Sequence, residues 1–108
     1  MGADAAEPKP TLGDVATSAL DALDDIERST EAGANSYSRA GRPFARVSAA
    51  ALEVRLESLV AQAALRTPDT TASDRGPGWV RFAPRSLDRF AADRATAWIE
   101  HAWRHAAD

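Results

Sequence analysis

The chain has 108 residues, a formal net charge of −3 and no cysteine. The absence of cysteine excludes disulfides, thiolate catalysis and cysteine-ligated zinc. No apolar run approaches the roughly 18 residues that span a bilayer, and the first residues lack the basic-then-apolar pattern of a secretory signal. We therefore expect a cytoplasmic protein without a cofactor, with a disordered lead-in over residues 1–10 and a single domain over residues 11–108.

Charge is distributed unevenly along the chain. Residues 1–31 carry eight acidic side chains against Lys9 and Arg28, a net charge of −6. Residues 32–108 carry eleven arginines against eight acidic side chains, a net charge of +3. Two interpretations of this asymmetry are open. The acidic helix is simply solvated or packs near the basic body, or, alternatively, the arginines form an anion-binding face. The planar guanidinium of arginine suits the recognition of phosphate and carboxylate.

Residues 11–31 are predicted to form one acidic amphipathic helix. Thr11 and Asp14 have the spacing of a helix N-terminal cap, and Gly33 is the expected stop signal. Apolar residues recur at three- and four-residue steps at Leu12, Val15, Ala16, Ala19, Leu23 and Ile26. Because this stripe is narrow, we expect the helix to lie across a sheet or against a partner.

Strand patterns begin near Tyr37. A short strand is predicted there, a second over residues 44–47, and a third over residues 51–57, where apolar and charged side chains alternate. This alternation places Leu52, Val54 and Leu56 on one face, and Glu53, Arg55 and Glu57 on the other. The short connection over residues 48–50 predicts antiparallel pairing of the second and third strands.

The stretch from Arg75 to Pro84 is predicted to be the strand around which the domain is organised. A Gly-Pro-Gly turn signal and a proline bracket it. Alternation places Val80 and Phe82 on one face, and Trp79 and Arg81 on the other.

Two further segments precede this strand. Residues 59–65 predict a short helix. Residues 67–78 predict a long loop, which is either mobile or functional.

A long helix is predicted from Ser86 almost to the end of the chain, with Ser86 as its cap and Asp88 in its first turn. Its apolar face comprises Leu87, Phe90, Ala91, Ala95, Trp98 and Ala102, widened by Ile99 and Trp103. The expected fold is α+β: a small antiparallel sheet of three to four strands, with the N- and C-terminal helices packed on it.

Four short stretches carry a resemblance to a known family. They are Gly41-Arg42-Pro43-Phe44-Ala45, the segment Leu52–Leu56, Gly78-Trp79-Val80 and the segment Trp98–Arg104. Together they resemble the YjbR/MmcQ-like family, although Arg42 stands where that family usually has lysine. The small luciferase-domain family of unknown function, with its own Gly-Trp-Val strand, is a rival match. The first resemblance implies a small α+β fold described as DNA-binding-like.

The candidate binding residues are arginines and aromatic residues on the predicted strands: Arg39, Arg42, Arg46, Arg55, Arg81, Tyr37 and Trp79. Arginine beside an exposed aromatic side chain can bind phosphate and stack bases. The acidic net charge and the lack of a dense basic stripe disfavour nucleic acid, and the same aromatic side chains can instead belong to the core. We predict a non-enzymatic binding or regulatory module for a protein or a small anionic ligand.

Two alternatives come from other features of the sequence. His101 and His105 are one helical turn apart and could ligate a metal, which would indicate a small metal-dependent protein or enzyme. Two ligands are few for such a site, and the sequence contains no Ser-His-Asp order, P-loop or zinc-protease motif. We therefore assign no catalytic residue and no metal ligand. The acidic first helix could also dock a structural subunit on a larger partner.

Overall fold

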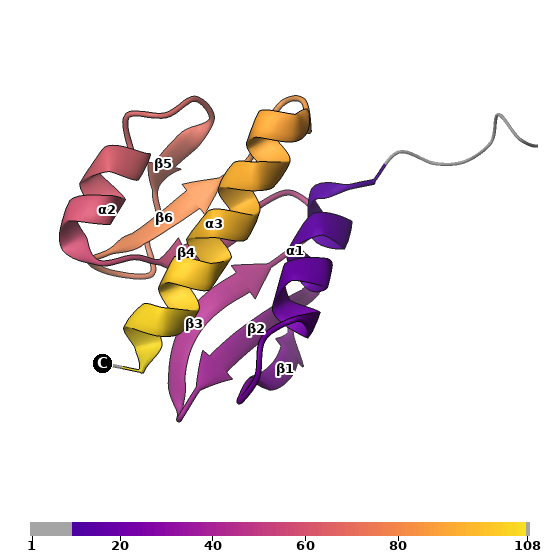
Figure 1. The fold of residues 1–108 in the computed structure, drawn as a ribbon, viewed down its shortest axis with the longest axis vertical. Coiled ribbons are helices and arrows are strands. Elements are labelled where there is room, and N and C mark those ends of the chain that lie inside the picture. Colours follow the sequence, from indigo (N-terminus) through magenta and orange to yellow (C-terminus); the bar gives the residue numbers. More distant parts are fainter. Residues whose placement is uncertain (1–9, 108) are drawn as a thin grey trace, which may run out of the picture.

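The computed structural model describes residues 10–107, in which a single antiparallel sheet is packed against three helices (Figure 1). The elements are α1 (Leu12–Asp21), β1 (Glu27–Glu31), β2 (Ala34–Arg39), β3 (Arg42–Val47), β4 (Leu52–Arg55), α2 (Ser58–Ala64), β5 (Thr70–Ala72), β6 (Trp79–Phe82) and α3 (Arg89–Ala106). The strand order is β1-β2-β3-β4-β6-β5. The α+β class is confirmed, but the sheet has six strands instead of three to four.

The first predicted helix is half as long as expected. Its capping box is present, because the Thr11 hydroxyl accepts from the Asp14 N–H and the Asp14 carboxylate accepts from the Thr11 N–H. The helix ends at Asp21, however, and residues 27–31 form edge strand β1. These five residues are polar, so helical periodicity could not identify them; pairing with β2 makes them a strand.

Two Ala-Gly pairs form the hairpin turns that the sequence analysis missed. Ala32 and Gly33 join β1 to β2 with φ of 52° and 78°, and Ala40 and Gly41 join β2 to β3 with φ of 52° and 77°. Positive φ at both central residues is what a type I′ turn requires. Gly33 therefore closes a hairpin and does not end a helix.

The predicted faces of β4 and β6 are confirmed. Leu52 lies opposite Phe82 and Val54 opposite Val80, and all four are buried on the side of the helices. β6 is nevertheless not the centre of the sheet, because only β5 lies beyond it. The strands in contact with α3 are mainly β3 and β4.

The predicted loop over residues 67–78 contains edge strand β5. Thr70 pairs with Phe82 and Ala72 with Val80. A three-residue strand with two threonines has too few residues to show a period, so its identity depends on pairing with β6. Short helix α2, by contrast, lies close to its predicted position.

The long C-terminal helix begins later than predicted, because its cap is Asp88, whose carboxylate accepts from the Ala91 N–H at 2.8 Å. Phe90 is 69% exposed and does not belong to the buried face. The buried positions of α3 are Ala91, Ala95, Ile99, Ala102 and Ala106. The four alanines among them let α3 approach both the sheet and α1 closely, and Figure 1 shows the two helices side by side on one face of the sheet.

Two expectations from the sequence concern membrane-spanning helices and the N-terminal lead-in. None of the helices within residues 10–107 combines the length and the apolar composition needed to cross a bilayer. The lead-in predicted for residues 1–10 lies outside the described residues, apart from Pro10.

Candidate functional site

A row of polar residues crosses all six strands on the sheet face opposite the helices. Its members are cross-strand neighbours: Ser29, Ser36, Arg46, Glu53, Arg81 and Thr71. Side chains alternate between the faces of a strand, and Ala45, Val54 and Val80 beside this row are buried in the core shared with the helices. The row therefore points to the face that no helix within residues 10–107 covers.

Glu53 is the centre of this row and is only 7% exposed. Its Oε1 lies 3.4 Å from Nη1 of Arg46, and its Oε2 accepts from the Ser73 hydroxyl at 2.6 Å. Arg81 lies directly opposite on β6. A carboxylate removed from water requires such partners, because burying it unpaired costs several kcal/mol. Ser73 in turn accepts from the Arg75 N–H, which holds the connection between β5 and β6 on the sheet.

Hydrogen-bond donors outnumber acceptors around Glu53. We use the name arginine face for Arg46, Arg55 and Arg81, which are all half-buried. Within the described chain, the Arg55 and Arg81 guanidinium groups form no hydrogen bond or ion pair. Nε of Arg46 and the hydroxyl of its cross-strand neighbour Ser36 are buried and also lack a partner there. Arg55 and Arg81 thus present cationic donors without a matching anion among residues 10–107.

The other two predicted arginines lie at the far end of α3. Arg39 Nη1 donates to the carbonyl of Trp103 at 3.0 Å, and its guanidinium stacks on the Trp103 ring at 3.7 Å from the centroid. Arg42 Nη1 lies 3.4 Å from the carbonyl of Ala106. Cations at this position satisfy the last carbonyls of a helix and complement its dipole. The structure thus separates Arg39 and Arg42 from the arginine face.

The predicted aromatic residues do not present open rings on this face. Tyr37 is 4% exposed and Phe44 is fully buried, both within the core. Trp79 is 9% exposed, and the Arg75 guanidinium lies over its ring at 5.0 Å from the centroid. Base stacking needs an accessible ring face, so these side chains do not form a stacking platform.

The two histidines lie on the last turns of α3, away from Arg46 and Arg81, and only Arg55 of the arginine face lines a pocket with His105. Their rings are stacked with centroids 6.1 Å apart, and Nε2 of His101 accepts from the Glu57 N–H at 3.2 Å. This hydrogen bond already occupies Nε2 of His101, one of the nitrogen atoms that could otherwise bind a metal ion. The described residues contain no group of three or more acidic, histidine or cysteine side chains that could hold a metal ion.

His101 makes folding sensitive to acid. Burial, followed by repulsion from His105 and Arg104, lowers the pKa of His101 below its ordinary value of 6.5, against an opposing effect of Glu57. The unfolded chain therefore binds the proton more tightly, and protonation also removes the acceptor of the Glu57 N–H. The resulting contribution to stability is complete above about pH 6.5 and is lost as the pH falls through the lowered folded pKa.

We accordingly expect His101→Gln to reduce the acid sensitivity of the fold. Between about pH 7.5 and about pH 5.5, the free energy of unfolding should fall more in the wild type than in the variant. Urea unfolding at the two pH values measures both changes. Identical changes in the wild type and His101→Gln would contradict this role.

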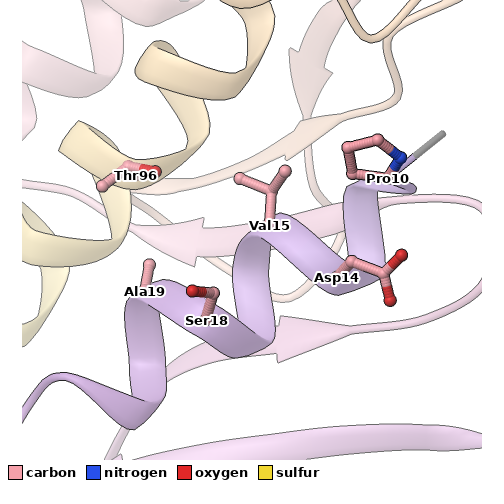
Figure 2. A pocket seen from close by; sticks show the side chains of 6 residues that line it. All are labelled: Pro10, Asp14, Val15, Ser18, Ala19 and Thr96. Atoms are coloured by element: carbon pink, nitrogen blue, oxygen red, sulfur yellow. The ribbon is translucent and has the colours of Figure 1, made fainter.

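A shallow hollow between α1 and α3 offers no comparable chemistry. It has a volume of about 340 Å³ and is drawn in Figure 2, where Val15 and Ala19 of α1 lie on the side toward Thr96 of α3. Pro10 and Asp14 border it at the start of α1. Its lining contains no buried charged side chain, because Asp14, the charged residue among the six, is exposed. We therefore assign the hollow no function.

Sequence reasoning missed the two residues that organise the arginine face. Alternation places Glu53 on the strand face opposite Leu52 and Val54, but it does not reveal that this side chain is buried. Ser73 lay in a segment predicted to be a loop, and no local pattern marked its hydroxyl as a partner for a residue twenty positions earlier. The signal that could have identified Glu53 as buried is its position between Leu52 and Val54 in a largely apolar strand.

No family model, curated protein or solved structure matches this chain, so the resemblance to the YjbR/MmcQ-like family remains a prediction.

Proposed function

We propose that the protein is a non-enzymatic binding module that docks an acidic segment of a partner protein on its arginine face. The observation that supports this function is the presence of Arg46, Arg55 and Arg81 on a sheet face without a covering helix among the described residues. Arg55 and Arg81 lack an anionic partner there. Guanidinium groups bind carboxylates through paired hydrogen bonds, so an acidic segment supplies what this surface lacks.

An acidic protein segment fits this surface better than nucleic acid does. The aromatic rings of Tyr37 and Trp79 are buried, which removes the stacking contribution. The net charge of −3 also works against the long-range attraction that nucleic-acid binding proteins use.

The acidic first helix gives little support to the alternative of a structural subunit. Its apolar stripe, including Ala16 and Leu20, already packs against α3 and the core. Only its polar side, with residues such as Asp14 and Asp21, remains exposed. Docking through α1 would therefore depend on exposed charges alone, which contribute little once salt screens them.

The test is a binding titration of the tag-free protein with a fluorescent oligo-glutamate peptide over a salt series. We expect binding at low ionic strength that weakens as salt is added. Arg81→Gln should weaken it by about tenfold, because a charged hydrogen bond contributes about 1.5–3 kcal/mol. Arg55→Gln/Arg81→Gln should weaken it further. Arg28→Gln/Arg66→Gln removes the same charge as this double variant from exposed positions elsewhere, and should change affinity by less than about twofold.

Three results would contradict the proposal. The first is no binding of oligo-glutamate at low ionic strength, and the second is an equal loss of affinity in the control double variant. The third is tighter binding of an oligo-thymidylate of the same length, which would assign the arginine face to single-stranded nucleic acid instead. Far-UV circular dichroism of each variant establishes that the fold is retained.

A further inference from the structure

A second pocket lies where the end of β4 and the start of α2 meet the last turns of α3. Its volume is about 360 Å³, which falls at the small end of the range for ligand pockets, about 300–1,000 Å³. Residues that line it include Arg55, Leu56, Glu57, Ser58, Pro77 and His105. Glu53 and Arg81 are not among them, so the pocket is distinct from the centre of the arginine face.

Two side chains with nitrogen donors, Arg55 and His105, line this pocket. Arg55 is half-buried, and its guanidinium has no hydrogen bond or ion pair among residues 10–107. His105 is half-buried and stacks on His101 with an interplanar angle of 16°. The hydrogen bond from the Glu57 N–H fixes the His101 ring, and this ring in turn supports His105. The His105 ring is thus held at the pocket before any ligand arrives, and the Arg55 guanidinium has its donors available.

The remaining walls restrict which anion fits. Most of the exposed lining is apolar and Pro77 is an exposed part of it, whereas the Leu56 side chain is buried in the core. Glu57 is also a lining residue, and its carboxylate Oε2 accepts from the Val60 N–H at 3.4 Å as the cap of α2. A negative charge on a lining residue disfavours multiply charged ligands such as phosphate more strongly than singly charged ones. A carboxylate attached to a short apolar body matches both the charges and the apolar walls.

We propose that this pocket binds a monocarboxylate with a short apolar body, held by Arg55 and His105 at the carboxylate and by Pro77 and the apolar lining along the body. Arginine binds carboxylates in a bidentate manner, and the imidazole adds a second donor. The carboxylate belongs either to a free small acid or to the C-terminal residue of a peptide. This inference does not depend on the arginine face binding an acidic partner, although Arg55 borders both sites.

The test is an amide-resolved NMR titration of the tag-free full chain with hexanoate, and separately with the peptide Gly-Gly-Leu carrying an acetylated N-terminus. Hexanamide and the C-terminally amidated peptide are the matched ligands without a carboxylate. We expect shifts confined to residues around the pocket and an affinity for the carboxylates at least about tenfold above that for the amides. Hexanoate binding alone identifies a free acid as the ligand, and peptide binding alone identifies a chain terminus.

Variants locate the binding groups. Arg55→Gln should weaken carboxylate binding by about tenfold and His105→Gln by about threefold. Arg104→Gln removes a charge next to His105 from an exposed position and should have less than about a twofold effect. Equal affinity for carboxylates and amides, shifts centred elsewhere, or no binding of either carboxylate at millimolar concentration would overturn the proposal. His105→Gln should leave oligo-glutamate binding unchanged and Arg81→Gln should leave hexanoate binding unchanged, which separates this site from the arginine face.

Discussion

Gly78→Ala should lower the free energy of unfolding by about 3 kcal/mol or more, through strain at a special backbone conformation combined with a clash. Gly78 has φ of +81°, in the region that favours glycine. A Cβ atom there would lie 2.7 Å from the carbonyl oxygen of Leu56. The Leu56 N–H donates to the carbonyl of Gly78 at 2.8 Å, so the two backbones cannot separate without losing this bond.

Gly33→Ala is the matched control for Gly78→Ala. Gly33 has a similar φ of +78°, but no atom lies within 4 Å of its Cβ position. This variant should therefore lose only the conformational contribution, about 1 kcal/mol. Urea unfolding of both variants measures the difference, which isolates the clash with Leu56. Equal destabilisation of the two variants would show that the close approach of β4 and the loop before β6 does not constrain residue 78.

Arg46→Met should destabilise the protein by about 2 kcal/mol, because it leaves the Glu53 carboxylate buried without its ion-pair partner. We expect less than the largest values for buried pairs, since the Arg46 side chain is 24% exposed and water can reach part of the pair. The double variant Arg46→Met/Glu53→Met removes both charges and should be less destabilised than the two single changes added together. The interaction should amount to at least about 1 kcal/mol.

Glu53→Met also tests the connection between β5 and β6. It removes the acceptor of the Ser73 hydroxyl, so amide hydrogen exchange at residues 73–78 should accelerate relative to the wild type. Ser73→Ala is the matched variant, because it removes the same bond and leaves the ion pair with Arg46 intact. Additive effects of Arg46→Met and Glu53→Met, with unchanged exchange in this segment, would contradict the assigned network.

Part of the candidate site could be predicted from the sequence. Arg46, Arg55 and Arg81 were selected as anion-binding candidates because they lie on predicted strands, and strand alternation places them away from the apolar face. The same reasoning also selected Arg39 and Arg42, whose partners Trp103 and Ala106 are 64 positions away. No local pattern predicts that a hairpin will reach the end of the last helix.

Elements with local signals could be predicted from the amino-acid sequence. The Thr11–Asp14 capping box, the alternation over residues 52–56 and the strand over residues 79–82 follow from dihedral preferences and side-chain periodicity, which act over a few residues. The polar segments at residues 27–31 and 70–72, by contrast, are strands because of their tertiary pairing. Tertiary contacts also explain why Glu53 is buried, because hydrogen-bonded neighbours and packing partners distant in sequence supply the stabilising contacts.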